Sequence, residues 1–235
     1  MNTTLADAAR PFLDYIEQWQ KSLPSLKLEE LASQKDRLAI ISVDIITGFC
    51  SQGALSSPLV GAIETPIAGL LQRAWNLGVR NIIFTQDTHE PDAVEFSAFP
   101  PHCIRGTVEA ETAAALKALP FYDQVTIIEK NSISSGLNTG MQTWMDAHPQ
   151  VDTFIVVGDC TDLCIYQMAM HLRLDANSRQ LQRRVIVPAN VVATYDRLVA
   201  DAQSQGGFAH GARFLNSVFL YHLALNGVEL GGALD

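Results

Sequence analysis

The sequence contains few cysteines and no run of basic residues, and both absences exclude classes of protein. Only four cysteines occur in 235 residues, and their spacing fits neither a disulfide scaffold nor a paired zinc ribbon. Sixteen basic against twenty-five acidic residues give a formal charge of −9, and the pair Arg183-Arg184 is the longest basic run. We therefore expect reduced thiols, a small-molecule ligand and no nucleic-acid partner.

Long apolar segments are also missing. No stretch approaches 18 uncharged apolar residues, which is about the length that a transmembrane helix needs. The N-terminal residues mix acidic with apolar side chains and lack the basic-then-apolar order of a signal peptide. These features predict no membrane partner and a cytoplasmic location.

Strand-like and helix-like patterns alternate along the chain. Nearly continuous apolar runs rich in β-branched residues, typical of strands buried on both faces, occupy residues 38–44, 79–85, 125–129, 153–158 and 184–188. Helical spacing of apolar residues covers residues 63–77, 109–118, 139–147, 161–177 and 211–226. This order predicts a three-layer α/β/α fold that is doubly wound around a mostly parallel sheet.

A further amphipathic helical pattern precedes the first strand. It covers residues 5–22 and is followed by a short linker-like stretch. No repeat or second composition regime appears elsewhere. We therefore expect an N-terminal helical extension over residues 1–36 and a single α/β domain over residues 37–235.

The expected strands end in polar residues. Asp44 and Asp87 end the first two strands, Lys130 ends the third, and a polar turn over residues 158–164 follows the fourth. In an open α/β sheet, ligands bind at the carboxyl ends of the strands. These residues should therefore meet along one edge of the sheet.

Cys164 falls in the first turn of the helix expected after the fourth strand. A helix N-terminus carries partial positive charge, which lowers a thiol pKa, so we interpret Cys164 as a nucleophile; the alternative is a small buried packing residue. Asp44 could take the thiol proton and Lys130 could stabilise charge, as acyl transfer requires. The backbone N–H groups of Cys160 and Cys164 could form an oxyanion hole.

A long polar loop after the second strand carries metal-binding residue types. Asp87 and His89 are two positions apart, and His102 could return to them, with Glu95 or water completing the shell. Such a set suits Zn²⁺, Mn²⁺ or Fe²⁺ with positions left open for substrate. The alternative is a loop histidine beside a capping aspartate.

Over about residues 37–230, the chain resembles the isochorismatase-like cysteine hydrolase superfamily, and within it the nicotinamidase branch. The resemblance rests on short motifs at the strand ends, namely Val43-Asp44 with Phe49-Cys50, Gln86-Asp87-Thr88-His89, Phe99-Pro100-Pro101-His102-Cys103, Glu129-Lys130 and Gly158 with Thr161-Asp162-Leu163-Cys164.

The resemblance implies roles for individual residues. By this resemblance, the catalytic triad consists of Asp44, Lys130 and Cys164. The metal ligands would be Asp87, His89 and His102, with Glu95 as a variable fourth ligand. It also implies a non-proline cis peptide bond between Asp159 and Cys160.

Two aromatic side chains, Phe49 and Phe99, match positions that flank the substrate ring in the family. The resemblance implies a metal-dependent amidase that hydrolyses nicotinamide or a similar small amide to the acid and ammonia through a Cys164 thioester. It also implies a homo-oligomer.

Three alternatives to a nicotinamidase remain open. They are a metal-free isochorismatase-like vinyl-ether hydrolase, a hydrolase of N-carbamoyl compounds or ureides, and a non-catalytic binding module or redox sensor. The loop over residues 131–140 departs from the family by being small and polar. It could admit a larger amide, or leave the ring to Phe49 and Phe99 alone.

Overall fold

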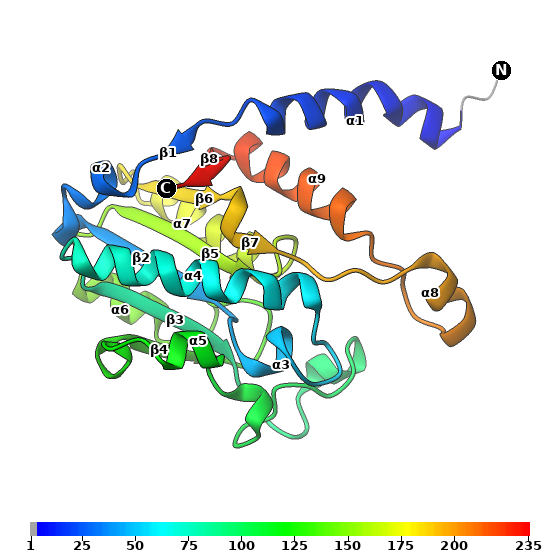
Figure 1. Cartoon of the computed structure of the whole chain (residues 1–235), viewed down its shortest axis with the longest axis horizontal. Helices are drawn as coiled ribbons and strands as arrows, with labels where there is room; N and C mark the ends of the chain where they lie inside the picture. The colour runs from blue at the N-terminus through cyan, green and yellow to red at the C-terminus, as the bar shows by residue number, and fades with distance from the viewer. Residues whose placement is uncertain (1–3) are drawn as a thin grey trace.

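A computed structural model describes residues 4–235, and Figure 1 shows a central sheet with helices on both sides. The strands are β1 Ser25–Leu26, β2 Leu38–Val43, β3 Asn81–Asp87, β4 Thr126–Lys130, β5 Thr153–Asp159, β6 Arg184–Pro188, β7 Val192–Ala193, β8 Glu229–Gly231 and β9 Ala233–Leu234. The α-helices are α1 Leu5–Lys21, α2 Leu28–Ala32, α3 Thr47–Cys50, α4 Pro58–Asn76, α5 Ala114–Lys117, α6 Met141–Ala147, α7 Cys164–Ser178, α8 Val199–Gln205 and α9 Ala212–Leu225.

The central sheet is parallel throughout. Its strand order is β4-β3-β2-β5-β6-β8, and the short β7 pairs with the end of β5. Every residue of β2 is buried, because this strand has neighbours on both edges and helices over both faces. The predicted α/β fold with its parallel sheet is therefore confirmed.

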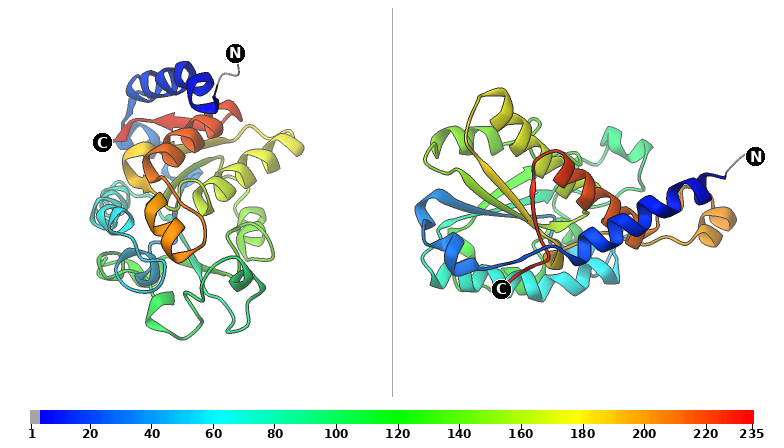
Figure 2. Two further views of the ribbon diagram at one scale, coloured as in Figure 1. Left: turned by 90° about the vertical axis from the view of Figure 1, so that its right-hand side faces the viewer. Right: turned by 90° about the horizontal axis from the view of Figure 1, so that it is seen from above.

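Two helical layers cover the sheet (Figure 2). One face carries Ile40 and Val157, which pack in a core with residues of α4 and α5. The opposite face carries Ile41 and Val156, which pack in a second core with residues of α6, α7 and α9. Successive side chains of a strand point to opposite faces, so each buried strand supplies both cores. Within residues 4–235, no helix has both the length and the apolar character needed to cross a membrane.

The prediction of a helix over residues 109–118 is largely wrong. Only Ala114–Lys117 is α-helical, after a single 3₁₀ turn at Val108–Ala110. Between them the backbone is extended and pairs with the segment after β2, through Thr47 N–H to Glu111 O at 2.8 Å and Ala113 N–H to Ile45 O at 3.1 Å. These tertiary hydrogen bonds outweigh the local helical preference.

The N-terminal helix α1 packs along α9, as Figures 1 and 2 both show. Ile16 is only 1% exposed, and Trp19 lies edge-on to Tyr221 with ring centroids 5.1 Å apart. After α1, strand β1 pairs in parallel with β9, with Ser25 opposite Ala233. The first residues of the chain, 1–3, lie outside the described residues. From residue 4 onward, the predicted extension lies against the α/β core.

Ile16→Ala should lower the free energy of unfolding by about 2–5 kcal/mol, because it leaves a cavity between α1 and α9. The measurement is urea denaturation followed by circular dichroism. Leu5→Ala is the control, since Leu5 lies in the same helix but is 86% exposed. Equal stability of the two variants would mean that α1 does not pack on α9 in solution.

Candidate active site

Four strand ends bring the predicted catalytic residues together. Asp44 follows β2, Asp87 ends β3, Lys130 ends β4, and Cys164 begins α7 after β5. The four strands are adjacent in the order β4-β3-β2-β5 and run in one direction, so their carboxyl ends share one edge. Each of the four side chains is almost completely buried.

Gly158 lets β5 approach β2 closely beside Asp44. Its φ is +120°, and a Cβ atom at this position would lie 2.0 Å from the carbonyl oxygen of Val43. Only glycine fits that space and that backbone conformation. The next peptide bond, between Asp159 and Cys160, is cis, as predicted.

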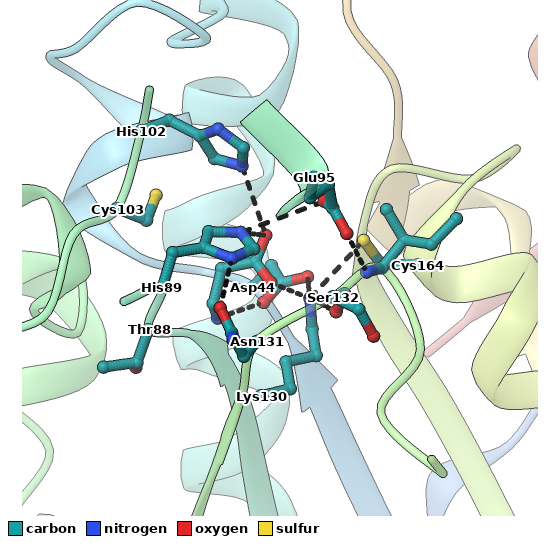
Figure 3. A network of polar contacts seen from close by, with 12 residues as sticks. Asp44, Thr88, His89, Glu95, His102, Cys103, Lys130, Asn131, Ser132 and Cys164 are labelled. Atoms are coloured by element: carbon teal, nitrogen blue, oxygen red, sulfur yellow. Dashed lines mark hydrogen bonds and ion pairs between the residues drawn. The ribbon is translucent and has the colours of Figure 1, made fainter. Parts of the chain in front are cut away.

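Lys130 is the centre of the polar network in Figure 3. Its Nζ lies 2.9 Å from Asp44 Oδ2 and donates hydrogen bonds to Asp87 Oδ1 and, at 3.1 Å, to the carbonyl oxygen of Ser132. The same Nζ lies 3.7 Å from Cys164 Sγ. One buried ammonium group therefore contacts both carboxylates and the thiol.

The buried charges shift one another's pKa values. Burial raises the pKa of Asp44 to about 6, because the attraction of Lys130 offsets only part of the desolvation and Asp87 adds repulsion. Burial acts in the same direction on Asp87, but Lys130 and the two neighbouring histidines outweigh it and hold the pKa of Asp87 well below its ordinary value. Burial opposes the charge of Lys130, but the two carboxylates raise its pKa well above the usual range.

The surroundings of Cys164 act on its thiol in opposite directions. Burial and the nearby carboxylates raise the pKa of the thiol above its ordinary value, whereas Lys130 lowers it. A carboxylate oxygen of Asp44 lies within 4.8 Å of the sulfur, so a base is available beside the thiol.

Backbone N–H groups are available next to the thiol. Among the described residues, the N–H groups of Cys160 and Cys164 donate to no other backbone group. Cys164 is the first residue of α7, where N–H groups have no partner within the helix. These two donors fit the predicted oxyanion hole.

The predicted metal ligands meet next to Lys130. Asp87 Oδ2 lies 3.6 Å from His89 Nε2 and 3.7 Å from His102 Nε2, while its other oxygen faces Lys130. The other ring nitrogen of each histidine has its own hydrogen-bond partner. His89 Nδ1 lies 2.9 Å from Asn131 Oδ1, and His102 Nδ1 lies 2.8 Å from the carbonyl oxygen of Pro100. Partners of this kind orient histidine ligands in metal sites.

The residues present fit a divalent ion. Two ligands about 2.1 Å from a tetrahedral ion lie about 3.4 Å apart, which is close to the distances between Asp87 and the histidines. His89 Nε2 and Glu95 Oε1 are buried, lack a hydrogen-bond partner within residues 4–235 and lie 3.9 Å apart. An ion would satisfy both atoms. Glu95 is held by its other oxygen, which accepts a hydrogen bond from the Ile133 N–H at 3.1 Å.

A pocket opens onto Cys164 and three of the candidate metal ligands, Asp87, Glu95 and His102. Phe49 and Phe99 line it, as predicted. They do not line it alone, because further walls come from residues that the sequence analysis left without a role, namely Leu55, Ile133, Asp159, Leu163 and Tyr195. The small polar loop after Lys130 therefore supplies an apolar wall through Ile133.

Asn131 is a further site residue that the sequence analysis did not identify. Besides holding His89, its Oδ1 accepts a hydrogen bond from the N–H of Glu90 at 3.3 Å, which ties the metal-binding loop to the end of β4. Its position directly after Lys130 was the one feature of the sequence that could have indicated a role in the site. Side chains next to a catalytic residue at a strand end commonly support its neighbours, but sequence does not show which neighbour.

Comparisons with known proteins agree with this geometry. A family model of the isochorismatase domain matches residues 38–212. Nicotinamidase 1 of Arabidopsis thaliana is 27% identical over 234 residues, covering 91% of this chain and 93% of the plant protein.

Solved structures share the fold. The cysteine hydrolase of Pseudomonas syringae pv. phaseolicola 1448A superposes with a TM-score of 0.68 at 26% identity, over 84% of this chain and 89% of that one. The pyrazinamidase of Pyrococcus horikoshii, in complex with zinc, superposes with a TM-score of 0.64 at 20% identity, over 83% of this chain and 98% of that one.

Lys130→Met should lower the free energy of unfolding of metal-free protein by about 3–5 kcal/mol, because it leaves Asp44 and Asp87 buried without a countercharge. Denaturant titration in the presence of a chelator measures this effect. Lys117→Met is the control, because the pair that Lys117 forms with Glu111 is half-exposed and should contribute little to stability. Wild-type stability in Lys130→Met would contradict the central role of the ammonium group.

Proposed function

The chain belongs to the isochorismatase domain family, and from this premise we propose that it is a metal-dependent cysteine amidohydrolase that acts on nicotinamide or a similar small amide. The similarity of most of the chain to Nicotinamidase 1 of Arabidopsis thaliana supports the substrate class. The observation that carries the proposal is the contact of one lysine with two carboxylates and the Cys164 thiol at the floor of a pocket.

The first half of the reaction forms a thioester. Asp44 takes the proton of the Cys164 thiol, and the sulfur attacks the carboxamide carbon of the substrate. Lys130 remains charged and stabilises the negative charge that develops on sulfur and on Asp44. The N–H groups of Cys160 and Cys164 hold the oxyanion, and the proton on Asp44 passes to the amide nitrogen, which leaves as ammonia.

The second half of the reaction releases the acid. Asp44 is a carboxylate again after ammonia has left, so it can take a proton from a water molecule that attacks the thioester carbon. The sulfur departs and regains a proton from Asp44. The products are the free carboxylic acid and the regenerated Cys164 thiol.

Asp87, His89 and His102 would hold the ion, with Glu95 as a further ligand. A bound Zn²⁺, Mn²⁺ or Fe²⁺ would supply a Lewis acid that can bind a ring nitrogen and orient the substrate. Phe49, Phe99 and Ile133 supply apolar walls that would hold the ring. Asn131 and the Pro100 carbonyl fix the orientation of both histidine rings.

The alternative reading as a redox sensor finds no support in the site. Redox-sensing cysteines have a low pKa and are accessible to solvent. Cys164 is 5% exposed, and burial raises the pKa of its thiol. The neighbouring base and oxyanion donors instead favour acyl transfer.

Cys164→Ala should reduce ammonia release from nicotinamide by about 10⁴-fold or more, because no other group can form the thioester. The assay is coupled detection of ammonia with purified, zinc-loaded protein. Cys50→Ala is the matched control, since Cys50 is an equally buried thiol that packs in the core. If Cys164→Ala keeps full activity, the mechanism must be abandoned. If wild type hydrolyses only a carbamoyl amide, the substrate assignment is wrong.

Removal of the metal should reduce ammonia release by at least about tenfold, and added zinc should restore it. His89→Ala should lose most bound zinc in elemental analysis, because it removes one of the two histidine ligands and leaves only Asp87, His102 and Glu95. His148→Ala is the control, since His148 follows α6 and bonds to the Trp144 carbonyl. Full activity of thoroughly chelated protein would argue against a metal-dependent reaction.

A further inference from the structure

Asp159 is an acidic residue inside the pocket that the proposed mechanism does not use. It is the last residue of β5, is 1% exposed and lines the pocket together with Cys164. Its position just before Cys160 places it beside the proposed oxyanion hole. Most of the other pocket walls, such as Leu55, Leu163 and Phe49, are apolar.

The hydrogen bonding of Asp159 is incomplete. The Cys160 thiol donates a weak hydrogen bond to Oδ2 at 3.5 Å. Oδ1 is buried and has no hydrogen-bond partner among the described residues. Buried polar atoms in folded proteins are nearly always paired, so an unpaired carboxyl oxygen in a pocket indicates a partner that binds there.

No ion pair of Asp159 occurs among the described residues. Lys130, the buried ammonium group of the site, contacts Asp44 and Asp87 instead. Burial and the proximity of Asp44 raise the pKa of Asp159 well above its ordinary value. Since Oδ2 faces the thiol, Oδ1 is the oxygen left to accept a hydrogen bond.

We propose that Asp159 is a specificity-determining residue that accepts a hydrogen bond from a second N–H group of the substrate. The preferred substrate class is then a small amide with an amino or ureido N–H in addition to the carboxamide that is hydrolysed. This inference rests on the amidase function proposed above. A hydrogen bond to the substrate explains why this pocket wall carries Asp159. An apolar residue there would avoid the cost of desolvating a carboxyl group.

A site built to bind a substrate N–H discriminates strongly against an analogue that lacks it, because the buried acceptor is then left unpaired. Asparagine at position 159 keeps a carbonyl oxygen that can accept a hydrogen bond at nearly the same place. Leucine keeps the size of the side chain but offers no acceptor. The pair Asp159→Asn and Asp159→Leu therefore separates hydrogen bonding from shape.

The experiment compares kcat/KM for nicotinamide with kcat/KM for its ring-amino isomers in zinc-loaded protein. We expect the wild type to prefer at least one isomer by about tenfold, Asp159→Asn to keep that preference within about threefold, and Asp159→Leu to lose it. Asp123→Leu, at an exposed position outside the pocket, is the control and should behave as the wild type. An unchanged preference in Asp159→Leu, or no preference in the wild type, would overturn the proposal.

A binding measurement separates this inference from the proposed function. In the Cys164→Ala background the amides bind without turnover, and the thermal midpoint reports their affinity. The preferred isomer should raise the midpoint more than nicotinamide does, and Asp159→Leu should abolish the difference. If the wild type hydrolyses no amide but this difference is present, the proposed function fails and the role of Asp159 stands. If hydrolysis occurs and the difference is absent, only the role of Asp159 fails.

Discussion

The candidate site depends on a single buried ammonium group. Lys130 compensates two carboxylates that would otherwise be too costly to bury together, and it reaches the thiol at the same time. Asp87 uses one oxygen for Lys130 and turns the other toward the two histidines. The proposed catalytic residues and the residues that could hold a metal ion are therefore one electrostatic unit, and a change in the charge of either part alters the other.

Parallel strands make this concentration of charge possible. Adjacent strands that run in one direction deliver their last residues to one edge, so Asp44, Asp87 and Lys130 need no long loop to meet. Close contact between β2 and β5 adds the thiol, and it requires glycine at position 158. His102, a candidate metal ligand, is different, because it comes from a loop that meets the segment after β3 through the bridge between His89 and Ile104.

Local patterns predicted the features of this molecule that local physics determines. Each strand of the centre of the sheet and each charged strand end could be identified, because burial on both faces and polar strand ends leave a direct pattern. The two-residue strands β1 and β9 have no such pattern. The extended segment near Thr112 follows from tertiary hydrogen bonds, and the raised pKa of Cys164 follows from burial, which depends on the whole fold. The contact of Asn131 with His89 likewise joins residues that are distant in sequence.

The pairing of β1 with β9 has a consequence for the order of folding. Ser25 and its partner Ala233 are separated by about 200 residues, so closing this contact carries one of the largest loop-closure costs in the chain. During synthesis, β1 leaves the ribosome long before its partner does. Strand β1 therefore remains unpaired while the central sheet forms. It pairs with β9 only in the final stage of folding, and until then its edge is exposed.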